Sequence, residues 1–336
     1  MEPIKEPTPL VLVTSSPHMH CGLTIGKSMR EVMLALVPAI IASVYYFRMS
    51  AAIVMVTCVV SAIVFETICN KVMHKPNTVQ DGSAALTGLL LAMCLPASMP
   101  PLFAAMGSMF AIVVGKAVFG GLGCNIFNPA HIGRAILLAS FPQQMTNWVL
   151  PATAAASDAV STATPLAVMR ATEKIWQAGG AASAVKLPDL MNLFWGNVGG
   201  SLGETCVPAL VLGGLYLIYK KLIDWRIPVF YLVTVAILTG VYGAVMGYPS
   251  TFPLYHLFAG GLMIGAFFMA TDWVTSPITK KGKIIYAIGL GVLTSLIRLR
   301  GSYTEGVCYS ILMMNMVTPM IDRFVRNVSF GGGLKK

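Results

Sequence analysis

Two carboxylates stand out because each lies within or at the end of a long apolar stretch. Glu66 lies in SAIVFETICNK. Asp272 ends an apolar run and is followed by WVTSP. A charged side chain inside a membrane is costly, so it is a functional candidate by default. Carboxylate oxygens bind hard cations, and both residues are therefore candidates for a Na⁺ or H⁺ path. The structural alternatives are that Glu66 faces the aqueous interface near Lys71 and that Asp272 caps a helix.

A second candidate is the glycine-rich break GGLGCNIFNPAHIGR, residues 120–134. Glycines allow close backbone approach, and Asn128 suits the N-cap of a helix that starts at Pro129. Asn125 and Asn128 are candidates for cofactor or ion contact, with a re-entrant turn as the structural alternative. Arg134 lies one turn into that helix. Its guanidinium must either pair with a phosphate or carboxylate or extend to the membrane interface.

The elements that carry these residues follow from composition. The chain has 336 residues, of which 56% are hydrophobic and only 11% charged, against about 25% charged in soluble domains. These values exclude a soluble enzyme, a disordered chain and a disulfide scaffold, and they predict an all-α polytopic membrane protein. The net charge of +10 comes from Lys and Arg spread between apolar runs. This spread indicates membrane topology and not a nucleic-acid surface.

Ten apolar segments are long enough, or nearly so, to be transmembrane helices. Several are short or contain Gly and Pro, which requires neighbouring protein to satisfy their backbone. The ten predicted spans are 31–47, 51–70, 82–95, 102–119, 129–141, 206–219, 227–247, 256–271, 284–299 and 306–324.

The distribution of basic residues predicts the orientation of these spans. With the N-terminus in the cytoplasm, 16 of the 23 Lys and Arg residues fall on the cytoplasmic side, Lys116 among them. Arg298 falls on the outer side. Positive charge favours the cytoplasmic side, so both termini are predicted to be cytoplasmic.

The longest polar stretch, 142–205, divides the spans into five and five. An odd number in each half means that the second half enters the membrane from the opposite face, which predicts inverted symmetry. The alternative is that ten helices simply divide evenly. The predicted organisation is a cytoplasmic segment, a first half, an extracytoplasmic loop, a second half and a cytoplasmic tail: 1–30, 31–141, 142–205, 206–324 and 325–336. The aromatic residues of the loop 142–205 predict that this loop is partly ordered.

The extracytoplasmic loop contains the string DAVSTATPLA, residues 158–167. Asp158, Ser161, Ala163 and Thr164 resemble the flavinylation motif D-x-x-[ST]-G-A-T, in which the last Thr hydroxyl carries FMN through a phosphoester. Thr162 stands where the motif commonly has Gly. Such chemistry needs a hydroxyl on an accessible loop with small neighbours. Taken alone, the string is also compatible with a flexible polar linker.

Three further segments carry a resemblance over most of the chain. SSPHMHCGLTIGKSMREVMLALVPA, GGLGCNIFNPAHIGRAILLASFPQQMTNW and MATDWVTSPIT occur in this order. All three resemble the RnfD/NqrB family of membrane proteins, which serve the Rnf ion-translocating electron-transport complex and the sodium-translocating NADH:quinone oxidoreductase. The length and Pro165 favour the Rnf type.

The resemblance implies a flavoprotein subunit in the inner membrane of a bacterium or archaeon. Its complex would pass electrons between ferredoxin and NAD while moving Na⁺ or H⁺, as a translocase whose complete active site is shared with other subunits. It further implies ten helices in inverted halves, FMN on Thr164 attached by a flavin transferase, and a non-covalent riboflavin. Asn125, Asn128 and Arg134 are the candidates for that second flavin. The sequence has no GxxxxGK[ST] and no GxGxxG after a strand, so NAD chemistry falls to partner subunits.

Two alternatives fit the spans without a redox cofactor. One is a small-solute channel or secondary transporter with inverted five-helix halves, which leaves DAVSTATPLA unexplained. The other is a scaffolding subunit, which would tolerate loss of both Thr164 and Asp272.

Overall fold

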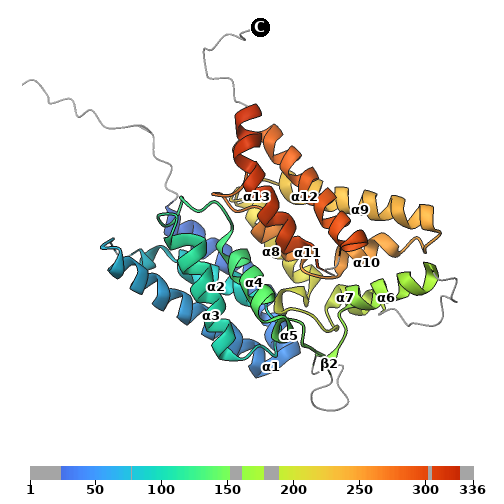
Figure 1. The fold of residues 1–336 in the computed structure, drawn as a ribbon, viewed down its shortest axis with the longest axis horizontal. Coiled ribbons are helices and arrows are strands. Elements are labelled where there is room, and N and C mark those ends of the chain that lie inside the picture. The colour runs from blue at the N-terminus through green and yellow to red at the C-terminus, as the bar shows by residue number, and fades with distance from the viewer. Residues whose placement is uncertain (1–23, 77, 152–160, 178–188, 302–304, 326–336) are drawn as a thin grey trace, which may run out of the picture.

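A computed structural model describes residues 24–76, 78–151, 161–177, 189–301 and 305–325. Within these ranges the chain is mainly helical, and the helices form two groups that lie side by side (Figure 1). The first group contains α1 to α4 and the second contains α8 to α13, and contacts of α1 with α8 and of α4 with α13 join the groups.

The first group starts with α1 (Ile25–Val72), which the Thr24 hydroxyl caps by accepting from the Lys27 N–H at 3.3 Å. The helix is interrupted at Arg48, whose φ of 52° is left-handed, and its two arms match the first two predicted spans. The remaining elements are α2 (Ser83–Met93), α3 (Pro101–Ile112), the π-helical turn η2 (Val113–Ala117) and α4 (Pro129–Ser140).

The second group has the same number of apolar segments. It consists of α8 (Val207–Tyr219), α9 (Arg226–Met246), a broken segment, α12 (Lys280–Arg300) and α13 (Val307–Phe324). The broken segment is formed by α10 (Phe252–Phe258), α11 (Leu262–Ile264) and the π-helical turn η5 (Gly265–Met269). Its two parts are bent by 64°, at the Gly260–Gly261 pair.

Each of the ten predicted spans is helical in the structure. By length and apolar composition, three described helices can cross a membrane, or four if the bent pair counts as one. Other apolar helices, such as α2 and α8, are shorter. These findings confirm a helical polytopic membrane protein at this coarser level, and the arrangement of ten spans stays a prediction.

The described parts of the connection between the groups contain helices and strands, in agreement with the order predicted from its aromatic residues. Its described parts contain α5 (Pro142–Met145), α6 (Pro165–Gln177), α7 (Leu190–Trp195) and η4 (Leu202–Glu204). Strands β1 (Trp148–Val149) and β2 (Ser161–Thr162) pair antiparallel, with Trp148 opposite Thr162. This ladder places the chain that leads to Thr164 beside the end of the first group.

Close backbone approach joins the two groups. A Cβ atom on Gly213 of α8 would lie 2.1 Å from the Ala35 carbonyl oxygen of α1, so only glycine fits there. The Ser43 hydroxyl donates to the Leu202 carbonyl at 2.6 Å, and the Leu202 N–H donates to the Leu95 carbonyl at 3.0 Å. The end of α2 is thereby fixed against the connection.

Candidate functional site

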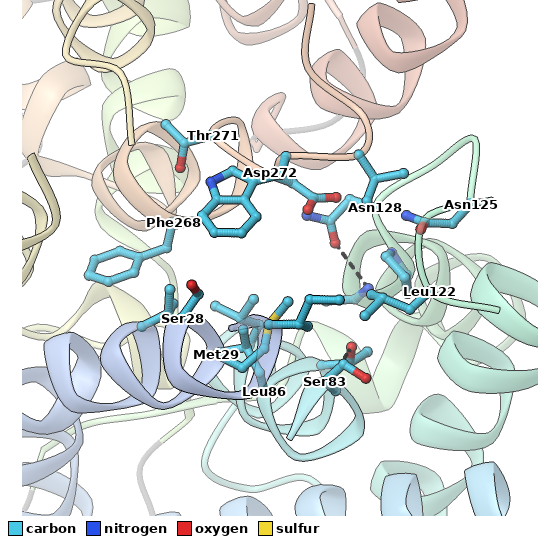
Figure 2. A pocket seen from close by; sticks show the side chains of 18 of the residues that line it. Ser28, Met29, Ser83, Leu86, Leu122, Asn125, Asn128, Phe268, Thr271 and Asp272 are labelled. Carbon is cyan, nitrogen blue, oxygen red and sulfur yellow. Dashed lines mark hydrogen bonds between the residues drawn. The ribbon is translucent and has the colours of Figure 1, made fainter. Parts of the chain in front are cut away.

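A cavity of about 270 Å³ lies between the two groups of helices. We call it the inter-half cavity. Met29 of α1 and Leu86 of α2 give it apolar walls, and Phe268 of η5 contributes from the other half. Figure 2 shows Asn125, Asn128 and Asp272 close to one another on the opposite side from Met29 and Leu86. A mostly apolar cavity with a few convergent polar groups is the usual form of a small-molecule site.

Asn128 is placed in the cavity wall by two hydrogen bonds. Its side-chain oxygen accepts from the Ala130 N–H at 3.1 Å, which confirms the predicted N-cap of α4. Its amide nitrogen donates to the Met269 carbonyl of the other half at 3.2 Å. Asn125 donates to the Phe127 carbonyl at 3.1 Å. Gly120, with a φ of 120°, begins the turn that presents both amides.

Asp272 lines the same cavity from the second half. Its carboxylate accepts from the Thr275 hydroxyl at 3.1 Å, and its carbonyl accepts from the Ser276 N–H at 3.1 Å. Asp272 therefore stabilises a turn and lines the cavity, whereas the N-cap of the following helix α12 is Thr279; its role in a cation path stays a prediction.

Glu66 lies elsewhere, in a buried ion pair with Lys116. The Lys116 ammonium is 2.8 and 2.9 Å from the two carboxylate oxygens of Glu66, and both residues are buried. Glu66 and Asp272 line different cavities. Among the described residues, no group of three or more His, Cys, Asp or Glu side chains is arranged to hold a metal ion.

Arg134 does not line the inter-half cavity; it pairs with Glu305, which lies two residues before the start of α13. The Arg134 side chain is buried and that of Glu305 is 13% exposed, and Glu204 lies close by with one oxygen accepting from the Ser201 hydroxyl at 2.8 Å. Burial and the neighbouring Glu305 carboxylate raise the pKa of Glu204 above its usual range. The Glu305 carboxylate is thus the partner that the Arg134 charge requires.

Thr164 is the residue at the start of α6. Its hydroxyl oxygen accepts from the Ala167 N–H at 3.2 Å, as an N-cap does. Thr164 is only 4% exposed, whereas the sequence predicted an accessible hydroxyl. Leu166 packs with Ala259 at the bend of the broken segment, which explains the burial. Asp158 lies outside the described residues, and Ser161 is in β2.

Comparison with known proteins identifies the family. The NQR2, RnfD, RnfE family matches residues 12–331, nearly the whole chain.

The chain belongs to this family.

Curated relatives agree along almost their full length. The chain is 52% identical over 321 residues to the D component of the proton-translocating ferredoxin:NAD(+) oxidoreductase complex of Clostridium ljungdahlii, covering 95% of this chain and 96% of the relative. It is 45% identical to the D component of the Na(+)-translocating ferredoxin:NAD(+) oxidoreductase complex of Acetobacterium woodii, with 95% of each covered. It is 38% identical to the D component of the ion-translocating oxidoreductase complex of Stutzerimonas stutzeri, with 92% of each covered. The resemblance inferred from the three motifs is confirmed.

Several charged residues that this family member buries were missed from the sequence. Lys116 and Arg298 were counted only as topology signals, yet Lys116 pairs with Glu66. Arg298 donates to the Ala259 carbonyl at 3.2 Å and to the His256 carbonyl, where α10 ends. Arg298 thereby satisfies the backbone of a broken helix. The signal that could have found Lys116 is its position inside an apolar stretch, as for Glu66.

Proposed function

We propose that this chain is the RnfD-type membrane subunit of an ion-translocating ferredoxin:NAD⁺ oxidoreductase complex, and that it works with the other Rnf-type subunits. The names and full-length coverage of the relatives support this assignment. The proposed topology is ten spans in two inverted halves in the plasma membrane, with both termini cytoplasmic. In support, the start of α1 and the end of α13 lie toward the upper side of Figure 1, and α5 and β2 toward the lower side.

We further propose that the Thr164 hydroxyl carries FMN as a phosphoester, attached by a flavin transferase. The observation that carries this proposal is the position of Thr164 as the N-cap of the 13-residue helix α6. The first N–H groups of a helix and its dipole favour a phosphate at this end. A phosphoryl group on the capping oxygen would therefore lie where the backbone already offers donors.

The burial of Thr164 adds a condition to this chemistry. A transferase needs the hydroxyl exposed, and Thr164 is 4% exposed when α6 is packed. Attachment therefore precedes packing of α6 against the broken segment, or requires the start of α6 to separate from it. Either route predicts that the folded, unmodified protein is a poorer acceptor than the newly made chain.

The inter-half cavity is the proposed site of the second, non-covalent flavin. Its apolar walls fit a flat aromatic ring system, and Asn125 and Asn128 offer amide groups to ring nitrogens and oxygens. Flavins supply one- and two-electron transfer, while the protein supplies binding, orientation and electrostatics. Arg134 belongs to a separate ion pair and acts on this site only through the helix α4 that it shares with the Asn128 cap.

The test of the covalent site uses variants that separate the hydroxyl from the cap. Thr164→Asn keeps an N-cap side chain but removes the hydroxyl, Thr164→Ser keeps both, and Thr162→Ala is the register control. In-gel flavin fluorescence after denaturation is expected for wild type, Thr164→Ser and Thr162→Ala, and not for Thr164→Asn. Fluorescence that survives Thr164→Asn disproves the site. A native protein without any flavin, purified from cells that contain the transferase, favours the alternative of a cofactor-free channel or transporter.

A further inference from the structure

The ion pair of Glu66 and Lys116 has the geometry of a cation site that is filled by a side chain. The three protons of the Lys116 ammonium point to three oxygen atoms: both carboxylate oxygens of Glu66, and the Ser83 hydroxyl at 2.6 Å. Thr78 donates to Glu66 at 2.7 Å, and Ser83 donates to Asp81 at 2.5 Å. The oxygens thus surround one positive charge.

Oxygen ligands of this kind suit a small monovalent cation as well as an ammonium group. Hard cations prefer carboxylate, carbonyl and hydroxyl oxygens. The carboxylate is buried, so removal of its cation would leave a charge that the surroundings cannot stabilise. Whatever leaves this position must therefore be replaced by another positive charge or by a proton.

Lys116 lies between two cavities. It lines the inter-half cavity, and it also lines a second cavity of about 300 Å³ with Glu66, Lys75 and Thr78 in its wall. Glu66 lines only the second cavity and Asp272 only the inter-half cavity. The long flexible Lys116 side chain is thus the charged group of the described chain that faces both spaces.

The backbone around Lys116 is suited to this position. Lys116 lies in the π-helical turn η2, where the Val118 N–H donates to the Val113 carbonyl at 3.0 Å. Single π-helical turns are frequent at functional sites. A Cβ atom on Gly115 would lie 2.8 Å from the Pro129 Cα, so the turn is pressed against the start of α4, next to the Asn128 cap.

We propose that Glu66, Ser83 and Lys116 form an exchange site for monovalent cations, in which the Lys116 ammonium is a tethered cation that Na⁺ or H⁺ replaces. An electron that arrives in the inter-half cavity adds one negative charge there and attracts the Lys116 ammonium. The Glu66 carboxylate then takes up one Na⁺ or one H⁺ from the second cavity. When the electron leaves, Lys116 returns to Glu66 and displaces the cation, so one Na⁺ or H⁺ is bound and released for each electron.

The coupling step rests on the proposed flavin in the inter-half cavity, whereas the cation site itself does not. Among the described residues, the other titratable groups that face Glu66 are Cys69 on its own helix, Asp81 of the turn Val79–Asp81, and Lys75 of the adjoining loop. Lys75 donates to the Gly120 carbonyl at 2.7 Å, so it is held away from the carboxylate. Lys75 therefore offers a matched control lysine in the same cavity.

The first experiment empties the site with Lys116→Met in the purified complex. Thermal unfolding is followed while Na⁺ replaces choline at constant ionic strength, and separately while the pH is lowered. A ligand that binds only the folded state stabilises it by mass action. We expect the Tm of Lys116→Met to rise by several °C with Na⁺ or with acidification, which identifies the cation. We expect the Tm of Lys75→Met and of Glu66→Gln/Lys116→Met to respond as wild type does. A Lys116→Met protein whose Tm responds to neither cation more than wild type overturns the proposal.

The second experiment does not depend on the stability of Lys116→Met. Glu66→Gln/Lys116→Met has no charge left in the site and is expected to fold. The midpoint potential of the non-covalent flavin is measured in this variant and in wild type as Na⁺ and pH are varied. We expect the wild-type potential to depend on the exchanged cation more steeply than the potential of the variant, whose remaining pH dependence is that of the flavin ring itself. An equal dependence in both proteins overturns the coupling. If no non-covalent flavin is present, the proposed function fails at that point, and the thermal experiment still decides the cation site.

Discussion

The ion pair between Arg134 and Glu305 gives the sharpest stability prediction. The two side chains are 7% and 13% exposed, and they connect α4 of the first half to the segment that leads into α13 of the second. Arg134→Met removes the positive charge and leaves a buried carboxylate. The carboxyl group of Glu305 then becomes neutral at pH 7 by binding a proton, although the usual pKa of a Glu side chain is near 4.3.

The magnitude follows from that proton. Holding a carboxyl group of this pKa protonated at pH 7 costs roughly 2.7 pH units at about 1.36 kcal/mol each, or about 3.7 kcal/mol. This value agrees with the ~3–5 kcal/mol usual for breaking a buried pair. A loss of this size lowers the Tm by roughly 10 °C in a protein of this size class. Because protonation becomes easier at lower pH, the loss should shrink by about 1.4 kcal/mol for each pH unit.

The assay is thermal unfolding of the purified protein in detergent at neutral and at mildly acidic pH. Arg134→Met/Glu305→Gln leaves no net charge in the pair and should recover most of the lost Tm. Glu204→Gln is the matched control: burial and Glu305 raise the pKa of Glu204, so replacing it by a neutral amide should change the Tm less than Arg134→Met does. Single and double variants whose effects simply add, with no dependence on pH, would refute this account.

Three other outcomes are expected. Gly88→Ala puts a methyl group 2.5 Å from a carbonyl oxygen of α1 and should lower the Tm, whereas Gly240→Ala, with its nearest neighbour at 3.5 Å, should not. Burial alone would raise the pKa of Asp224, but the backbone N–H two residues on and the Lys283 ammonium lower it. The ionised Asp224 carboxylate thus stabilises the fold above the usual Asp pKa, near 3.9, and this stabilisation is lost as the pH falls below that value. Asp224→Asn should therefore flatten the acid side of a Tm–pH profile. Asn128→Ala should lower the Tm, by loss of a cap worth about 1 kcal/mol, and should also lower the content of non-covalent flavin. Asn128→Ser should restore the Tm but not the flavin.

The helices were predictable because membrane segments are recognisable by their apolar length. All ten predicted segments are helical, including the short one at α2 and the Gly-containing one that bends by 64°. Asn128 was predictable as a cap because an asparagine directly before a proline and a helical run indicates a helix N-terminus from the local sequence alone.

The ionic partners were not predictable, because they depend on which helices meet. Glu66 and Lys116 are 50 positions apart, and Arg134 and Glu305 are 171 apart. Residues that are close in space and that far apart in sequence leave no periodic signal. The same reason explains Thr164, whose burial comes from packing of α6 on the broken segment and not from its Ala/Ser/Thr-rich surroundings.

The two buried pairs differ in a way that assigns them different tasks. The Arg134 pair joins the two halves, and a planar guanidinium that is always charged suits a fixed contact. The Glu66 pair lies within the first half, with both residues supplied by α1 and η2. Lys116 can therefore change partners without separating the halves, and an ammonium on a flexible stem with three rotatable donors suits exchange. Loss of the first pair should therefore cost stability under all ionic conditions, whereas loss of Lys116 should make stability depend on the cation supplied.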